Sequence, residues 1–165
     1  MAQQDSRPPL LPVLQGIPTY DDAAGWLLTL SARVEPSYID SMGHMNVSRY
    51  VHLFDLATWD LFARVGIDRD YIRGQQAGMF AVEQHLRYLG ELRENDPLEI
   101  HSRVLDVRER GLIFVNVMTD PVRKRVAAVE EAVGVHIDMR TRRTSALPPA
   151  IAAALQGLKG EAKGG

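Results

Sequence analysis

The chain has 165 residues, of which 45% are hydrophobic and 24% charged, a composition typical of one globular domain. The absence of cysteine excludes disulfide bonds, thiolate metal ligands and cysteine nucleophiles. The formal net charge of -2, from 19 basic and 21 acidic residues, lacks the basic excess typical of nucleic-acid-binding domains, so we expect no nucleic-acid partner.

The ends of the chain differ in character from its middle. The N-terminal stretch MAQQDSRPPLLPVLQGIP lacks the basic head and long apolar run of a secretory leader, and no apolar run approaches the roughly 18 to 20 residues that span a bilayer. We therefore expect a cytoplasmic protein without a membrane partner. Residues 1–22 are predicted to be an N-terminal arm, 23–147 the domain, and 148–165 a tail with one or two helical turns in its alanine-rich part.

The first elements of the predicted domain are a strand and a long helix. Residues 26–36, WLLTLSARVEP, predict a strand that ends at Pro36. After a loop, a helix is predicted from about Asn46 to Val65, with Asn46 as its N-cap and Gly66 as its stop. Apolar residues recur along it at helical spacing and form one broad stripe. The stripe consists of Val47, Tyr50, Val51, Phe54, Ala57, Leu61, Phe62 and Val65.

The second half of the domain has the pattern of a β-sheet. Residues 68–78 are predicted to form a turn, and apolar and polar residues then alternate over 80–88. Short polar turns between strands favour an antiparallel meander, and a single apolar helix needs a sheet to cover it. The predicted fold class is α+β, with an antiparallel sheet of about five strands wrapped around one long central helix. The remaining strands are predicted at 98–107, 112–118 and 126–137.

A polar loop directly before the helix concentrates reactive side chains. A carboxylate, a glycine, a histidine and an asparagine lie within the seven residues from Asp40 to Asn46. A helix N-terminus offers free backbone N–H groups and a dipole that favours negative charge, so a thioester carbonyl placed there would be polarised. A nearby carboxylate can take a proton from water or attack the carbonyl carbon itself. The loop therefore holds the groups for acyl transfer to water and leaves both routes open.

The segment YIDSMGHMNVSRYVHLFDLA resembles the signature of hotdog-fold acyl-CoA thioesterases of the 4-hydroxybenzoyl-CoA thioesterase-like family. That pattern has an Asp, a short spacer, Gly-His-Met or Gly-His-Val, Asn-Asn, then a Tyr and a Phe-Glu pair. Val47 replaces the second Asn and Asp55 replaces the Glu, which affects the expected substrate contacts more than the reaction class. The segment FAVEQHLRYLGELRENDPLEIHSRV resembles the strand pair that follows in the family. The matching positions of the signature are Asp40, Gly43, His44, Asn46, Tyr50 and Phe54.

The resemblance implies an enzyme that hydrolyses an acyl-CoA substrate to free acid and CoA, needs no cofactor, and uses Asp40 as its catalytic carboxylate. It also implies a homodimer or homotetramer with sites at the subunit interface. His44 is expected to fix the loop or position substrate rather than to be the base. Asn46 is expected to cap the helix first and contribute to catalysis second. The candidates for substrate contact are Gly43, Met45, Tyr50 and Trp59.

Both candidate carboxylates have an ordinary alternative interpretation. Asp40 is of a residue type that often caps a turn without any catalytic role. Glu83 is a candidate second catalytic carboxylate across a dimer interface, or else a solvated strand residue. Its position on the strand after the helix predicts that it shares a face with Ala81 and His85.

The remaining polar residues give weaker signals. The five histidines show no H-x-H or H-E-x-x-H arrangement, so no metal site is predicted. Basic residues gather at predicted strand ends and turns, where they could hold the phosphates of CoA or be ordinary solvated turn residues. They are Arg103, Arg108, Arg110, Arg123, Lys124 and Arg125.

Two other functions compete with thioester hydrolysis. A hotdog-fold enoyl-thioester hydratase or dehydratase would carry the pattern Asp-x-Asn-Pro-x-His, which is absent, since Asp40 and His44 are four apart with no Asn-Pro between them. A non-catalytic acyl-CoA-binding protein could lack the carboxylate, and Asp40 argues against it. Serine hydrolases with a G-x-S-x-G elbow, P-loop proteins and proteins with a dinucleotide-binding fingerprint are excluded because these motifs do not occur.

Overall fold

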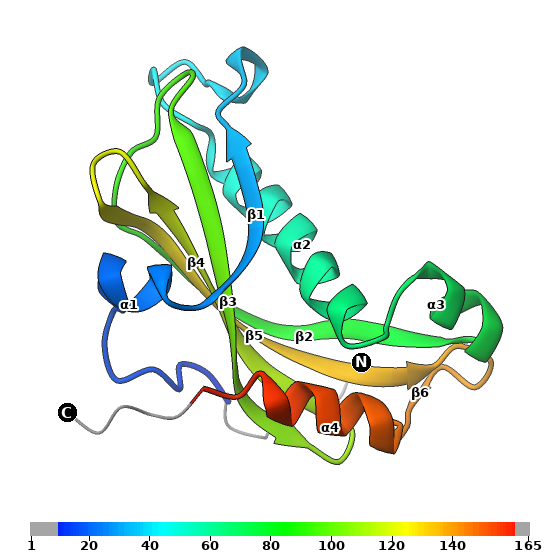
Figure 1. Ribbon diagram of the computed structural model, residues 1–165. Coiled ribbons are helices and arrows are strands. Elements are labelled where there is room, and N and C mark those ends of the chain that lie inside the picture. Colours follow the sequence, from blue (N-terminus) through cyan, green and yellow to red (C-terminus); the bar gives the residue numbers. More distant parts are fainter. Residues whose placement is uncertain (1–9, 161–165) are drawn as a thin grey trace, which may run out of the picture.

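The computed structural model describes residues 10–160, so residues 1–9 of the predicted arm and 161–165 of the predicted tail lie outside the described residues. A curved antiparallel sheet holds the long helix α2 on its concave inner face (Figure 1). The elements are α1 (Tyr20–Ala24), β1 (Leu27–Arg33), η1 (Pro36–Tyr38), α2 (Val47–Arg64), α3 (Arg69–Gln75), β2 (Ala77–Tyr88), β3 (Pro97–Arg108), β4 (Gly111–Asp120), β5 (Arg125–Asp138), β6 (Arg143–Thr144) and α4 (Pro149–Gly157).

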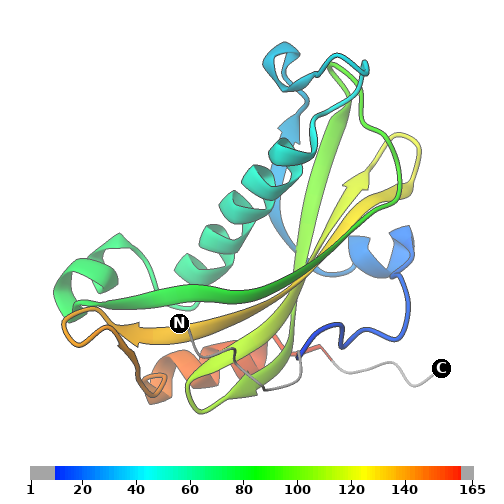
Figure 2. The same ribbon diagram turned by 180° about the vertical axis from the view of Figure 1, so that it is seen from behind.

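The strand order of the sheet is β1-β3-β4-β5-β2, with the short β6 paired to β5. The predicted meander is confirmed for β3, β4 and β5. The predicted pairing of the strand at 80–88 with the next strand is wrong, because β2 pairs with β5 instead (Figure 2). The connection from β2 to β3 is too long for a tight hairpin and crosses the end of the sheet. The twelve residues of β2 thus lie along the fourteen-residue β5.

Helix α2 follows the sequence prediction closely. Its N-cap is Asn46, whose side-chain oxygen accepts the Ser48 N–H at 3.0 Å. One stripe of the helix is buried against β1, β3 and β4. Large side chains at helical spacing fill the concave face because they remove apolar surface from water on both partners. Two predicted members of the stripe, Val47 and Val51, are exposed, and Leu53 is buried in addition. The buried residues of α2 are Tyr50, Leu53, Phe54, Ala57, Leu61 and Phe62.

Two helices depart from the prediction. Residues 68–78, predicted as a turn, contain α3, which begins because the Asp68 carboxylate accepts the Tyr71 N–H at 2.8 Å. The alanine-rich segment forms the nine-residue α4, which is longer than the one or two turns expected. Burial of Ile151 and Leu155 against the inner-face core explains its length, since tertiary packing stabilises a helix that would be marginal alone.

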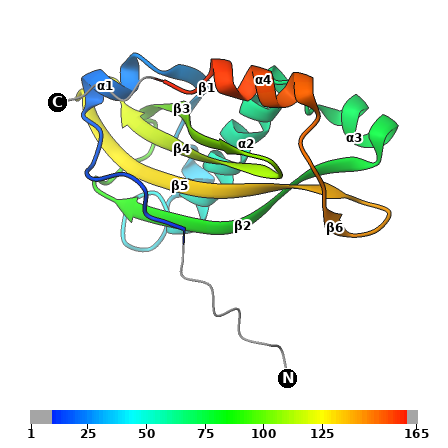
Figure 3. The same cartoon turned by 90° about the horizontal axis from the view of Figure 1, so that it is seen from below.

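The outer, convex face of the sheet is covered by α1 and by the described part of the arm (Figure 3). Ala23 and Leu11 are buried against outward-facing valines and isoleucine of β4 and β5. Two strand carboxylates hold the arm through its backbone. Glu83 accepts the Leu10 and Leu11 N–H groups at 3.0 and 2.7 Å, and Glu131 accepts those of Val13 and Leu14 at 2.7 and 2.8 Å.

Over residues 10–160, no helix combines the length and apolar character needed to cross a membrane. The same residues contain no group of three or more metal-ligating side chains placed to hold an ion.

Candidate active site

The loop before α2 is fixed by backbone hydrogen bonds at both ends. The Asp40 N–H donates to the His44 carbonyl at 3.1 Å, and the Gly43 N–H donates to the Asp40 carbonyl at 3.0 Å. The Met45 N–H donates to the Leu92 carbonyl at 2.7 Å, which ties the loop to the β2–β3 connection. Gly43 has φ +83°, a conformation that disfavours other residues. These bonds give Asp40 a defined position beside the start of α2.

The Asp40 carboxylate is held by two donors. Its Oδ1 accepts the Met42 N–H at 2.8 Å, and its Oδ2 accepts the Asn46 amide at 3.1 Å. The Met42 bond, followed by the Asn46 bond, lowers the pKa of Asp40 below its ordinary value. Because its pKa is lowered, the carboxylate is ionised at neutral pH. Each of its oxygens has a second lone pair, so it can still accept a proton or attack a carbon.

Asn46 links the helix cap to the carboxylate. Its side-chain oxygen accepts the Ser48 N–H, while its nitrogen donates to Asp40, so one side chain satisfies both. Its N-cap role is therefore confirmed, and its contact with Asp40 places it beside the candidate catalytic group. The His44 Nδ1 lies 3.2 Å from the Met45 carbonyl, within the same loop. This contact agrees with a loop-fixing role for His44.

The other predicted substrate contacts lie in three different surroundings. Met45 is fully buried in the core beneath the loop, and the structure gives it no open surface. Tyr50 is also buried; its hydroxyl donates to the Gly90 carbonyl at 3.3 Å and its ring meets Tyr88 edge to face at 5.3 Å. Trp59 is 41% exposed and lines a cavity. The structure thus brings Asp40, Gly43, His44 and Asn46 together, and places Trp59 elsewhere.

Glu83 shares a face with His85, as predicted, because the two residues pair with Val133 and Glu131, but the prediction that it also shares this face with Ala81 is wrong. A bulge between Ala81 and Glu83 pairs Ala81 with Gly134 and Glu83 with Val133. Gly134 and Val133 are neighbours on β5, so they point to opposite faces of the sheet. Their partners on β2 do the same, and Ala81 faces inward while Glu83 faces outward. Within one chain, Glu83 is therefore on the side of the sheet that carries the arm, not on the side that carries α2.

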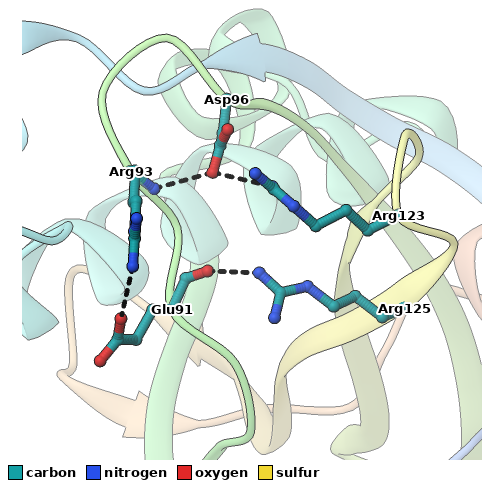
Figure 4. A pocket seen from close by; sticks show the side chains of 5 residues that line it. All are labelled: Glu91, Arg93, Asp96, Arg123 and Arg125. Carbon is teal, nitrogen blue, oxygen red and sulfur yellow. Dashed lines mark hydrogen bonds and ion pairs between the residues drawn. The ribbon is translucent and has the colours of Figure 1, made fainter.

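A charged cavity of about 410 Å³ lies beside the β2–β3 connection. It contains two of the basic residues considered for CoA binding, Arg123 and Arg125, and both form ion pairs within the chain. Arg123 pairs with Asp96 at 3.1 Å and with Asp120 at 2.7 Å. Arg125 pairs with Asp120 at 3.4 Å. Arg125 also donates to the Glu91 carbonyl at 2.5 Å. Figure 4 shows these side chains turned toward one another across the opening. The lining residues are Glu91, Arg93, Asp96, Arg123 and Arg125.

A second cavity, of about 450 Å³, is mostly apolar and lies between α2, α3 and the first half of β2. Trp59 is its contribution from α2 and Ile72 its contribution from α3. A mainly hydrophobic hollow with few polar groups is the usual form of a site for a small organic group. Its lining residues are Trp59, Ile72, Gly78, Met79, Phe80, Ala81 and Met139.

A row of polar side chains beneath α2 was missed from the sequence. At its centre, the Asn116 amide nitrogen donates to Thr58 Oγ1 and to Glu130 Oε2, both at 2.9 Å, and its oxygen accepts from Ser102 at 2.6 Å. The row separates the two hydrophobic clusters of the inner face, and every strand on the main path contributes one member. In strand order these are Thr29, Ser102, Asn116, Glu130 and Gln84.

Glu130 is the buried carboxylate of this row. Burial raises its pKa to about 7, against the hydrogen bonds from Asn116 and Gln84, and the nearby charge of Asp55 raises it further. The adjacent pair Glu130–Glu131 within the apolar run AAVEEAVGV was a usable signal, because one of two neighbouring strand residues must face each side.

Comparison with known proteins identifies the family. The profile of the thioesterase-like superfamily matches residues 34–155. The chain belongs to this superfamily. A bifunctional L-carnitine dehydrogenase/betainyl-CoA thioesterase of Agrobacterium fabrum is 31% identical over 133 residues, which are 81% of this chain but 27% of that protein. The chain thus spans about a quarter of that relative's length. A betainyl-CoA thioesterase of Pseudomonas aeruginosa is 24% identical over 80% of this chain and 83% of that protein.

Solved structures show that this thioesterase-like chain has the predicted hotdog fold. A hypothetical protein of Staphylococcus aureus, solved in complex with CoA, superposes with a TM-score of 0.76 at 19% identity, over 85% of this chain and 90% of that one. A 1,4-dihydroxy-2-naphthoyl-CoA thioesterase of Synechocystis superposes with a TM-score of 0.71 at 13% identity, over 79% and 96%. The fold prediction is therefore confirmed.

Proposed function

We propose that this chain hydrolyses an acyl-CoA thioester to a free acid and CoA, with Asp40 as the catalytic carboxylate. The observation that supports this most is an ionised carboxylate held by two hydrogen bonds directly before the N-terminus of α2. Membership of the thioesterase-like superfamily supports the reaction class.

The proposed chemistry uses the start of α2 and Asp40 together. The partial positive charge of the helix N-terminus polarises the thioester carbonyl and stabilises the oxyanion that forms on attack. Asp40 either takes a proton from the attacking water or attacks the carbonyl carbon to form an anhydride, which water then opens. The thiolate of CoA leaves in both routes. Asn46 holds one Asp40 oxygen, so it is a positioning residue in this proposal.

A homodimer is the assembly that best completes the site. Among the described residues β2 has a strand on one side only, and an unpaired edge readily takes a second strand. Exposed apolar residues Phe80 and Val82 lie on it. The Asp40 loop is hydrogen-bonded to Leu92, which follows the Tyr88 end of β2. The apolar cavity lies at the other end of β2, near Ala77. Antiparallel pairing of two β2 strands would therefore bring the Asp40 loop of one protomer to the cavity of its partner.

The relatives suggest which acyl-CoA to assay first. Several carry the name betainyl-CoA thioesterase, and they cover about four fifths of this chain. We propose betainyl-CoA as a substrate, with the apolar cavity as the acyl-binding site.

The test is an assay of the purified chain against a panel of acyl-CoAs that includes betainyl-CoA, with detection of released thiol. Thiol release from betainyl-CoA supports both the hydrolysis and the proposed substrate. If thiol is released from other acyl-CoAs but not from betainyl-CoA, the result supports the hydrolysis and not the proposed substrate. If an enoyl-CoA is hydrated and no thiol is released from any member, the chain is a hydratase. If nothing reacts but acyl-CoA binds, it is a binding protein. Either of these results would refute hydrolysis.

Shared sites are tested by mixing two inactive variants. Asp40→Asn removes the carboxylate, and Ala81→Phe fills the cavity. If each site uses Asp40 from one protomer and the cavity from the other, mixed dimers contain one intact site and regain activity after joint refolding. If both groups of a site come from one protomer, no mixed dimer has an intact site and activity is not regained. The double variant mixed with wild type is the reverse control, because its mixed dimers keep an intact site only if both groups come from one protomer. Size-exclusion chromatography with light scattering checks that dimers form.

A further inference from the structure

The walls of the apolar cavity continue along α2 and β2 toward two carboxylates. Ala81 is the last β2 residue that lines the cavity, and the next inward-facing residue after the bulge is Gln84, which donates to Glu130 Oε1 at 2.7 Å. On α2, Asp55 lies one turn before Trp59, so both project from the same flank of the helix. Asp55 on α2 and the Gln84–Glu130 pair beside β2 are therefore the next polar groups along these elements from the cavity-lining residues Trp59 and Ala81, although they do not line the cavity themselves.

Within residues 10–160, no cation forms an ion pair with either carboxylate. The Asp55 side chain is exposed, and its carboxylate forms no hydrogen bond or ion pair within the same residues. Glu130 is 1% exposed, its bonds come from two neutral amides, and no basic side chain of the described part of the chain lowers its pKa. Burying a carboxylate near another negative charge costs stability. A cationic ligand bound beside the two carboxylates would offset that cost.

The hydrogen bonds that Glu130 already accepts favour a cation without hydrogen-bond donors. Each oxygen already accepts one amide bond, so the side chain offers negative charge more than free acceptor sites. A quaternary ammonium needs no acceptors, because it has no N–H, and it is stabilised by negative charge and by aromatic faces. Trp59 supplies a partly exposed indole, held edge to face against Phe62 at 6.0 Å. Trp59 and the two carboxylates therefore suit this class of ligand.

The far end of the cavity is electrically different. There the Arg142 guanidinium lies over the Phe80 ring, 5.2 Å from its centre. A cationic group is repelled from that end and drawn to the end where Asp55 and Trp59 lie. The cavity thus favours one placement of a charged acyl group.

We propose that Asp55, Trp59 and Glu130 select acyl-CoA substrates whose acyl group carries a fixed positive charge of the quaternary ammonium class. The proposal rests on the thioesterase function proposed above and names the residues that read the acyl group. Asp55 and Glu130 supply negative charge, Trp59 supplies the aromatic face, and Gln84 and Asn116 hold Glu130 in place.

The test compares two thioesters of the same shape and different charge, betainyl-CoA and its carbon isostere tert-butylacetyl-CoA. Binding is measured by calorimetry in the Asp40→Asn background, where turnover does not interfere. We expect the charged thioester to bind at least about tenfold more tightly, and Glu130→Gln to reduce this ratio by about tenfold while leaving the neutral thioester unchanged. Glu131→Gln is the matched control, since it neutralises the adjacent carboxylate on the outer face and should keep the ratio.

Asp55→Asn gives an independent reading on an exposed residue, in case Glu130→Gln fails to fold, and should also reduce the ratio. Equal binding of the two thioesters, or a ratio that neither variant lowers, would overturn the proposal. Thiol release by the unmodified chain is measured separately. Its absence with a preserved charge-dependent binding ratio would refute hydrolysis but not the recognition of the cation.

Discussion

Two neighbouring residues of β5, Glu130 and Glu131, are both fully buried and belong to opposite faces of one sheet. On the outer face, Glu131 accepts two backbone N–H groups of the arm. On the inner face, Glu130 accepts from side-chain amides and lies near another carboxylate. Glu131 is bonded to backbone donors and holds the arm against the sheet. Glu130 carries a charge that no neighbouring basic group of the described residues balances. The comparison shows that Glu131 has a structural role, whereas the surroundings of Glu130 suit the binding of a cationic ligand.

The largest effect is expected from the packing that makes the inner face. Phe54 is fully buried between α2 and the sheet. Phe54→Ala should lower the free energy of unfolding by about 3 to 5 kcal/mol, because it removes buried apolar surface and leaves a cavity. Urea denaturation followed by circular dichroism measures it. A loss below about 1 kcal/mol would mean that α2 is not packed on the sheet as described.

The pH dependence of stability should distinguish the two glutamates. Because the folded-state pKa of Glu130 is raised to about 7, the folded state binds its proton more tightly than the unfolded state does. Its unfavourable contribution is absent at pH values below the unfolded pKa, grows as pH rises from the unfolded pKa to the folded pKa, and is constant above the folded pKa. Wild type should therefore lose about 3 kcal/mol relative to Glu130→Gln between pH 4 and pH 8.

Thermal denaturation over that range, with both proteins in the same buffers, measures this difference. A gap between wild type and Glu130→Gln that stays constant with pH would contradict the raised pKa. The same comparison with Glu131→Gln shows whether the effect belongs to the inner face.

A smaller effect is expected on the outer face. Glu131→Gln keeps an acceptor for the Val13 and Leu14 N–H groups but removes its charge, which should weaken the arm by about 1 to 2 kcal/mol. Hydrogen exchange of those two amides should accelerate while acyl-CoA hydrolysis stays unchanged. Unchanged exchange would show that the carboxylate does not hold the arm.

The smallest stability effect is expected at the helix cap. Asn46→Ala removes the acceptor for the Ser48 N–H and should cost about 1 kcal/mol. Asn46→Asp keeps the cap acceptor but places a second carboxylate against Asp40, so it should recover only part of the stability lost in Asn46→Ala and should not restore activity. It should also shift the acid limb of the pH–rate profile upward, since a bond that lowers the Asp40 pKa is lost. Full activity in Asn46→Asp would contradict the positioning role.

The sequence carried enough information to predict local structure wherever one physical signal dominated. The apolar stripe and the Asn46 cap predicted α2, and the short turns predicted β3 to β5. The pairing of β2 with β5 depends on contacts between residues far apart in the chain, which no local pattern records. The bulge before Glu83 shifts its face by one residue, and strict alternation could not reveal it. The helix α4 depends on tertiary burial of Ile151 and Leu155.

The candidate site was predicted in part for the same reason. Asp40, Gly43, His44 and Asn46 are close in sequence, so a local motif brings them together. The row through Asn116 and Glu130 is assembled from five strands and one helix, and its members become neighbours only through strand register. Only the Glu130–Glu131 pair gave a local hint of it.

The most direct test of the account is the thiol-release rate of Asp40→Asn against that of Asp68→Asn. Asp68 is a matched control because it also stands directly before a helix and accepts a backbone N–H at 2.8 Å. With both variants folded, Asp40→Asn should lose about 10²-fold or more in kcat/KM and Asp68→Asn should keep wild-type activity. If Asp40→Asn hydrolyses acyl-CoA as fast as wild type, Asp40 is a turn residue and the proposed catalytic site is wrong.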